Sequence, residues 1–165
     1  MNETVRISAI VFVAVASGIL LIAVAATLAI AAGAPEGIRL PFLLICHGIE
    51  SRSPFIAGEA MPICFRCTGI YVGMLLGIGM GVPAVRWGRA PFPGWGVWVL
   101  AAPLIIDGVT QVAGLRESTN DLRVVTGLVA GAGFLLWAIT NVGVVASRSG
   151  DLPARDLGRK SQAKD

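Results

Sequence analysis

The stretch Thr68–Val85, TGIYVGMLLGIGMGVPAV, contains no charged residue. A helix needs about 20 mainly apolar residues to cross the hydrocarbon core of a bilayer, so this stretch predicts a membrane-spanning helix. Glycine recurs at every fourth position, at Gly69, Gly73, Gly77 and Gly81. This spacing places the glycines on one helical face, where another backbone can approach closely in lipid. The ridge suits either a groove for a substrate or lipid, or tight helix packing within the bundle or between protomers; we favour packing.

Three further stretches are long and apolar enough to cross a bilayer, at about residues 7–33, 95–113 and 124–147. The first also resembles a signal peptide, but its uncharged run exceeds the roughly 7–15 residues of a signal h-region, so we interpret it as an anchor. The composition agrees, since 14% of the residues are charged, against about 25% in soluble domains. We therefore predict an all-α integral membrane protein, folded as a compact four-transmembrane-helix bundle.

Two segments fall outside the predicted spans. Residues 38–46 are apolar but too few to cross, and Pro41 interrupts them, so we expect a short interfacial or re-entrant segment before the second span. Residues 148–165 alternate Arg, Asp and Lys with little apolar content, which is typical of a disordered, solvated tail. The sequence thus predicts one membrane domain over residues 1–147, followed by a polar cytoplasmic tail over 148–165.

Four spans place both termini on one side of the membrane, and the lysines and arginines indicate which side. The termini and the loop after the second span carry eight of the 13 basic residues, whereas the loops at 34–66 and 114–123 carry five. By the positive-inside rule the termini are cytoplasmic and the loop at 34–66 is extracytoplasmic. We expect a multi-pass protein of the cell membrane with lipid as its partner. The basic residues form no nucleic-acid motif, so nucleic acid is not an expected partner.

All three cysteines and the only histidine fall within 22 residues just before the glycine-rich span, as Cys46-His47 and Cys64-x-x-Cys67. Thiolate and imidazole groups together suit zinc and other borderline-soft metals. Neighbours in an extended chain point to opposite sides, so Cys46 and His47 can bind one ion only across a local turn, which Gly48 permits. We predict a metal site, with zinc as the preferred ion. Its candidate ligands are Cys46, Cys64 and Cys67, with His47 as a fourth ligand or as a partner behind them.

Two other interpretations of the cysteines stay open. A C-x-x-C pair at the mouth of a helix bundle also suits thiol–disulfide exchange, because a helix N-terminus and Arg66 between the two cysteines both favour the thiolate. A relay to a second thiol pair would need more cysteines than the chain has. The other interpretation is inert packing, since a free cysteine behaves as a small buried hydrophobe.

Polar residues gather where the third predicted span ends. Asp107 and Gln111 are four apart and share a helical face, and Asp107 lies about 10 Å from the helix end at about 1.5 Å per residue. A carboxylate at that depth is costly unless it is paired or protonated. Asp107 is therefore a functional candidate or, equally, one half of an ion pair with Arg66, Arg116 or Arg123.

The start of the fourth span carries groups that suit a polar or anionic ligand. Ser118-x-x-Asp121 fits an N-cap, and Asn120 and Arg123 lie on the emerging helix near its N-terminus, where anions bind. Both ends belong to the membrane face that holds the Cys/His loop, so one site between the helices is expected. The catalytic candidates are Asp107, Arg116 and Arg123, and the substrate-binding candidates are Arg66, Gln111, Ser118 and Asn120.

These motifs together resemble an uncharacterised family of small predicted integral membrane proteins, classed as a domain of unknown function. The family pattern runs C-H, P-x-C-x-R-C-x-G-x-Y-x-G, D-G-x-x-Q and R-x-S-x-N-x-x-R. It falls here on Cys46-His47, Pro62–Gly73, Asp107–Gln111 and Arg116–Arg123. The loop between the first two motifs departs from the pattern, because Gly48 follows the histidine and Pro54 interrupts the Arg-Ser-Phe run. The resemblance covers about residues 40–135 and implies a membrane protein without a settled activity.

Three functions fit these residues. The first is a metal site that acts on a lipid-like or anionic group held by the polar residues. The second is a membrane thiol–disulfide oxidoreductase that uses Cys64 and Cys67 and is linked to a membrane quinone. The third is a non-enzymatic, metal-stapled accessory or assembly subunit, whose glycine-rich faces contact a second copy or another membrane protein.

Overall fold

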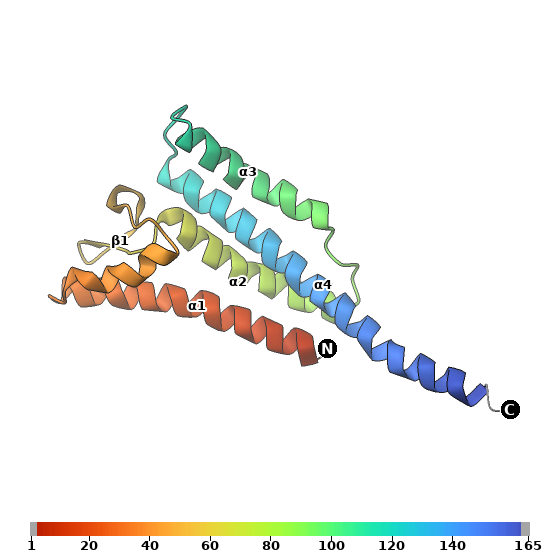
Figure 1. Cartoon of the computed structure of the whole chain (residues 1–165). Coiled ribbons are helices and arrows are strands. Elements are labelled where there is room, and N and C mark those ends of the chain that lie inside the picture. Colours follow the sequence, from red (N-terminus) through yellow and green to blue (C-terminus); the bar gives the residue numbers. More distant parts are fainter. Residues whose placement is uncertain (1–2, 163–165) are drawn as a thin grey trace.

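The computed structural model describes the backbone of residues 3–162 and, within that range, all side chains except those of residues 143 and 146–162. Four long helices form the fold: α1 (Glu3–Ala31), α2 (Phe65–Arg86), α3 (Gly94–Val112) and α4 (Asn120–Gln162). They lie side by side and alternate in direction (Figure 1). All four are long and apolar enough to cross a membrane, α4 over Asn120–Val142. The prediction of an all-α membrane bundle is confirmed.

The end of α4 differs from the sequence prediction. We expected the helix to end near residue 147 and a disordered tail to follow, but the backbone is helical to Gln162. A helix that is already nucleated gains one hydrogen bond for each residue added, so a polar continuation needs no new nucleus. Residues 163–165, and the side chains of the tail before them, lie outside the described part of the chain. The division into a membrane domain and a cytoplasmic tail stays a prediction.

The chain between α1 and α2 forms a compact cap on one end of the bundle. It contains two 3₁₀ helices, η1 (Glu36–Leu44) and η2 (Glu50–Arg52), and a hairpin of two short antiparallel strands, β1 (Phe55–Ile56) and β2 (Glu59–Ala60). The hairpin turn is tight because Ala57 and Gly58, with φ of 52° and 87°, both adopt the left-handed conformation. The short segment expected before the second span corresponds to η1, which lies along the C-terminal part of α1 (Figure 1).

Glycines on α2 and α4 form the tightest contact in the bundle. A methyl group at Gly73 would overlap the carbonyl oxygen of Leu128, and one at Gly131 would overlap that of Ile70. The contacts advance in the same direction along both helices, so α2 and α4 are parallel. Of the two uses expected for the glycine ridge, tight packing inside the bundle is the one observed. The other glycines in this contact are Gly69, Gly77 and Gly127.

α3 and α1 pack against this central pair from different sides. Leu100 of α3 fills the space that Gly133 leaves on α4, so close that a methyl group on Gly133 would lie 2.6 Å from the Leu100 side chain. α1 contributes small residues to a core shared with α2 and α4, among them Ala9, which packs with Ile78 and Leu135. The bundle therefore brings the start of α2, the end of α3 and the start of α4 to one end, beneath the cap.

Candidate functional site

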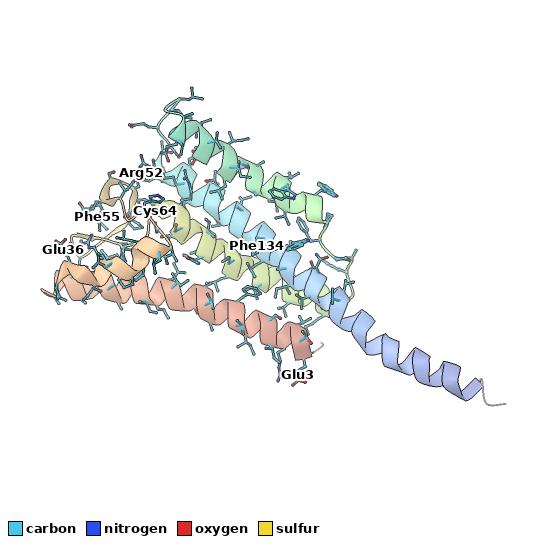
Figure 2. All side chains as sticks on the ribbon, in the orientation of Figure 1. Glu3, Glu36, Arg52, Phe55, Cys64 and Phe134 are labelled. Atoms are coloured by element: carbon cyan, nitrogen blue, oxygen red, sulfur yellow. The ribbon has the colours of Figure 1, made fainter. Side chains whose placement is uncertain are left out.

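The two groups of candidate residues lie at the same end of the bundle. Figure 2 shows Cys64 and Arg52 at the end that carries the cap, and Glu3 at the opposite end. Arg66, in the first turn of α2, reaches the end of α3 and makes an ion pair with Asp107. The thiol loop and the polar helix ends thus meet at one mouth of the bundle, as the sequence hypothesis of a single site required.

The three cysteine sulfurs converge. Cys46 follows η1, Cys64 directly precedes α2 with an extended backbone, and Cys67 lies in the first turn of α2. The three Sγ atoms lie within 4.8 Å of one another. The backbone N–H of Cys64 donates a hydrogen bond of 3.2 Å to Cys46 Sγ, an interaction of the kind that stabilises a thiolate. All three are free thiols in this structure.

The thiols lie in an apolar setting that still favours ionisation of one of them. Cys46 is buried in a cluster with Phe42, Met61 and Ile63, and the other two cysteines are partly buried beside it. Hydrogen bonds with Cys46 and, to a smaller extent, with Cys67 lower the pKa of Cys64 far below its usual value, against the opposing effect of burial. The lowered pKa favours the thiolate form of Cys64, the form in which cysteine binds a metal.

The sulfur positions fit a tetrahedral metal after a small adjustment. Zinc–sulfur bonds of about 2.3 Å separate two tetrahedral sulfurs by about 3.8 Å, so the thiols would close by at most about 1 Å around an ion. His47 is exposed and does not belong to this group of ligand atoms. The structure thus gathers three of the four predicted ligands, and a fourth tetrahedral position is left over.

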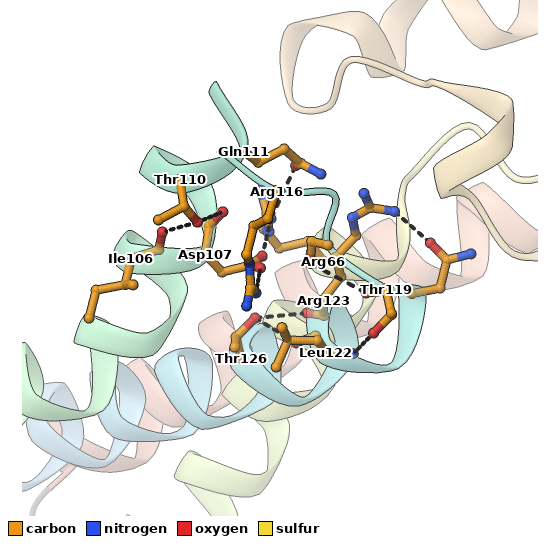
Figure 3. A network of polar contacts seen from close by, with 12 residues as sticks. Arg66, Ile106, Asp107, Thr110, Gln111, Arg116, Thr119, Leu122, Arg123 and Thr126 are labelled. Atoms are coloured by element: carbon orange, nitrogen blue, oxygen red, sulfur yellow. Dashed lines mark hydrogen bonds and ion pairs between the residues drawn. The ribbon is translucent and has the colours of Figure 1, made fainter. Parts of the chain in front are cut away.

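Asp107 is the centre of the polar group. It is 2% exposed, and its Oδ2 accepts from Arg66 Nη2 while its Oδ1 accepts from Arg116 Nη2 at 2.8 Å. Figure 3 shows both arginines converging on this carboxylate. Gln111 lies next to them, and its Oε1 accepts from Arg66 Nη2 at 3.5 Å. Of the three arginines considered as ion-pair partners of Asp107, the structure pairs Arg66 and Arg116 with it and not Arg123.

The helix cap of α4 lies one residue later than the sequence indicated. The Thr119 carbonyl accepts from the N–H of Arg123 at 3.1 Å, and Thr119 Oγ1 accepts from the N–H of Leu122 at 3.4 Å. Thr119 is thus the N-cap. Ser118, one residue earlier, is buried, and its hydroxyl donates to the Thr119 carbonyl oxygen at 3.4 Å.

Arg123 is buried at the same place without a carboxylate partner. It is 6% exposed, and its Nη1 donates to Asn120 Oδ1 at 2.6 Å. Within the described residues it takes part in no ion pair. It lines a polar cavity of about 390 Å³ between η2 and the start of α4. The cavity is lined by Ser51, Arg52, Glu117, Ser118, Thr119, Asn120 and Arg123.

The cavity includes residues that sequence reasoning missed. Ser51 and Arg52 belong to the loop in which Pro54 interrupts the Arg-Ser-Phe run of the family pattern, and neither is among the candidate site residues of the sequence analysis. The 3₁₀ helix η2 places both beside α4. One sequence feature could have indicated them. Arg52 is a basic residue in a motif loop that is expected on the same membrane face as Arg123.

Comparison with known proteins identifies the family. The profile of the family described as "Predicted membrane protein (DUF2085)" matches residues 46–137, more than half of the chain. The chain belongs to this family. Residues 46–137 contain the cap from Cys46 onward, α2, α3 and the start of α4 with every candidate site residue, whereas α1 and η1 lie outside the match.

Two archaeal relatives share this region. An uncharacterized protein of Methanocaldococcus jannaschii is 42% identical over 91 residues, which is 54% of this chain and 58% of the relative. An uncharacterized protein of Methanothermobacter thermautotrophicus is 40% identical over 94 residues, 56% of this chain and 82% of the relative. The chain thus spans little more than half the length of the first relative. No solved structure matches the chain significantly.

Proposed function

We propose that this protein holds a metal ion at Cys46, Cys64 and Cys67, with zinc as the best fit, and positions a polar or anionic group of a lipid-like molecule next to it. The observation that carries the proposal is the approach of the three Sγ atoms to within 4.8 Å of one another. Three thiolates leave one tetrahedral position for water, for a substrate or for His47, as in catalytic zinc sites. A bound metal of this kind supplies Lewis-acid chemistry.

The surroundings support a stable thiolate centre. Three thiolates around a divalent ion carry a net charge of −1, and the N-terminal end of α2 offers partial positive charge to it. Arg66 is placed between two of the ligands along the chain and is itself held by Asp107. In this proposal Asp107, with both oxygens engaged by arginines, positions Arg66 and Arg116 and does not contact the substrate.

The remaining polar residues support direct contact with a substrate. Arg123 and Asn120 line the cavity at the start of α4, together with Ser118. Gln111 lies within reach of Arg66 at the end of α3. Because more basic residues accompany the termini than the opposite loops, we place this mouth on the extracytoplasmic side of the cell membrane.

Metal analysis of the purified protein tests the proposal. Wild-type protein, purified in neutral detergent under reducing conditions and supplied with zinc, is expected to retain about one ion per chain after dialysis. Cys46→Ser, Cys64→Ser and Cys67→Ser are each expected to lose it, because two thiolates bind too weakly to survive dialysis. His47→Ala is the matched control and retains the ion. Wild-type protein that holds no metal, or a Cys64→Ser variant that holds as much as wild type, would refute the proposal.

Thiol–disulfide exchange is the second candidate, and the placement of Cys64 and Cys67 around the first residues of α2 supports it. In that function the two thiols would be oxidised to a disulfide, and two electrons and two protons would pass to a membrane quinone. Differential alkylation separates the two candidates. A reducible Cys64–Cys67 bond in metal-free protein isolated without reductant favours exchange, and three alkylatable thiols under those conditions favour the metal site.

A further inference from the structure

The cavity between η2 and the start of α4 has the composition of an anion site. It measures about 390 Å³ and brings two arginines, Arg52 and Arg123, to the N-terminus of a long helix. The first N–H groups of a helix have no acceptor within the helix, and together with the helix dipole they favour a bound anion. A helix N-terminus alone does not define an anion site. The hydrogen-bond and ion-pair partners of the two arginines show whether the cavity suits an anion.

Arg123 has unsatisfied hydrogen-bonding capacity inside the protein. Its side chain is 94% buried, since 6% is exposed, and its Nε has no hydrogen-bond partner in the described part of the chain. The hydrogen bond to Asn120 Oδ1 uses Nη1 alone. An unpaired donor on a buried charged group is costly, and an anion in the cavity that Arg123 lines would offset the cost of burying this charge.

The charges around the cavity do not balance. Arg52 and Arg66 act unfavourably on the Arg123 guanidinium, and Asp107 and Cys64 act favourably on it but each by less. Both oxygens of Asp107 are already engaged by other arginines. Like Arg123, Arg52 takes part in none of the ion pairs found among the described residues. The lining has one carboxylate, the exposed Glu117, against two arginines. An anion with more than one oxygen fits this excess of positive charge, because guanidinium groups bind phosphate through paired hydrogen bonds.

We propose that this cavity binds a phosphate group through Arg52, Arg123 and the first turn of α4. The phosphate belongs either to a lipid headgroup or to a free phosphate, since both present the same oxygens. The cavity lies where the membrane-spanning helices end, at the level of headgroups. This inference names the class of ligand in the proposed function. It rests on the part of that proposal that concerns the polar residues, and binding does not require the metal.

Direct binding measurements on the full-length protein in neutral detergent test the inference. The probes are inorganic phosphate, dioctanoyl phosphatidic acid, dioctanoylglycerol as the lipid without phosphate, and acetate as a simple carboxylate. Saturable binding is expected for at least one phosphate probe and for neither of the other two. Arg123→Gln and Arg52→Gln are each expected to weaken it by about tenfold or more, because each removes a charge-assisted hydrogen bond. Arg89→Gln, at the other end of α2, is the control and binds as wild type.

The outcomes separate the two sources of phosphate. Binding of phosphatidic acid alone assigns the site to a lipid headgroup, binding of inorganic phosphate alone assigns it to a free phosphate, and competition between them shows that the phosphate group itself is recognised. The inference is overturned if neither binds, if acetate binds as tightly, or if both arginine variants bind like wild type. Arg52→Gln alters a half-buried side chain and keeps the test valid if Arg123→Gln does not fold.

Two crossed measurements distinguish this inference from the metal hypothesis. Metal-free Cys64→Ser is expected to bind the phosphate probe and still to require Arg123. Arg123→Gln is expected to retain its metal content. Loss of phosphate binding in Cys64→Ser, with its fold intact by size exclusion, would overturn the independence of the phosphate site from the thiol cluster.

Discussion

Arg66 makes an ion pair with Asp107, although the two lie 41 positions apart in the chain. Arg66 lies between Cys64 and Cys67, so this contact ties the first turn of α2, with its thiols, to the end of α3. The Asp107 carboxylate also receives Arg116 from the turn after α3. One buried carboxylate therefore holds together the parts of the chain from which the candidate site is built.

Replacing Asp107 tests this link. Asp107→Asn leaves Arg66 and Arg116 without a charged partner, and the free energy of unfolding is expected to fall by about 3 kcal/mol. Denaturant titration of the detergent-solubilised protein measures the change. Glu117→Gln, which removes an exposed carboxylate nearby, is the control and is expected to change stability by less than about 0.5 kcal/mol. Equal stability of the two variants would contradict the central role of Asp107.

The glycine contact between α2 and α4 predicts different effects for two Gly→Ala substitutions on the same helix. Gly73→Ala puts a methyl group onto the Leu128 carbonyl, so the helices must separate, and the expected loss of stability is about 2 kcal/mol. Gly79→Ala, on the same helix, meets nothing within 4 Å and is expected to be neutral or to stabilise by up to about 1 kcal/mol. Thermal unfolding of the two variants under identical conditions compares them. A destabilised Gly79→Ala with an unchanged Gly73→Ala would contradict the packing.

A bound metal should protect the cysteines from alkylation. All three thiols converge on one point, so an ion held there would block Cys46, Cys64 and Cys67 together. We expect little maleimide labelling of zinc-loaded protein and labelling of three thiols after a strong chelator is added, counted by intact mass. His47→Ala should show the same protection. Labelling that proceeds equally with and without chelator would argue against a shared ion.

The orientation in the membrane can be tested with single cysteine additions. Glu36→Cys lies in the cap and Arg89→Cys lies in the loop between α2 and α3, and both positions are exposed. If the termini are cytoplasmic, a membrane-impermeant maleimide labels Glu36→Cys in intact cells and labels Arg89→Cys only after permeabilisation. The parent protein provides the background from the native cysteines. The reverse pattern would invert the proposed orientation.

The sequence was most informative where a local property decides the structure. Runs of uncharged apolar residues located the four spans because crossing a bilayer depends on length and hydrophobicity. The depth of Asp107 in its span left two equal possibilities, a functional group or one half of an ion pair. The sequence could not predict which arginine pairs with Asp107. Arg66, Arg116 and Arg123 were equal candidates, and the choice among them depends on how α2, α3 and α4 pack.

Other features depended on tertiary contacts that no spacing reveals. The glycine ridge on α2 required a close neighbour, but only the fold shows that the neighbour is α4. Arg52 became part of a cavity through the turn of η2, and His47 separated from the thiols because its neighbour Cys46 takes the inward position. The extent of α4 was missed because helix continuation costs little once a helix exists, even for a polar sequence.

The glycine seam also constrains how this protein can move. At Gly73 and Gly131 the backbones of α2 and α4 are in direct contact, so at these points no side chain lies between the two helices that could change rotamer and let them slide. They should therefore travel as one rigid body, so that Cys64 and Arg123 keep a constant separation through any functional cycle. Opening and closing of the mouth would then require the cap and α3 to move relative to this pair. The ion pair between Asp107 of α3 and Arg66 of α2 would hold α3 in the closed position.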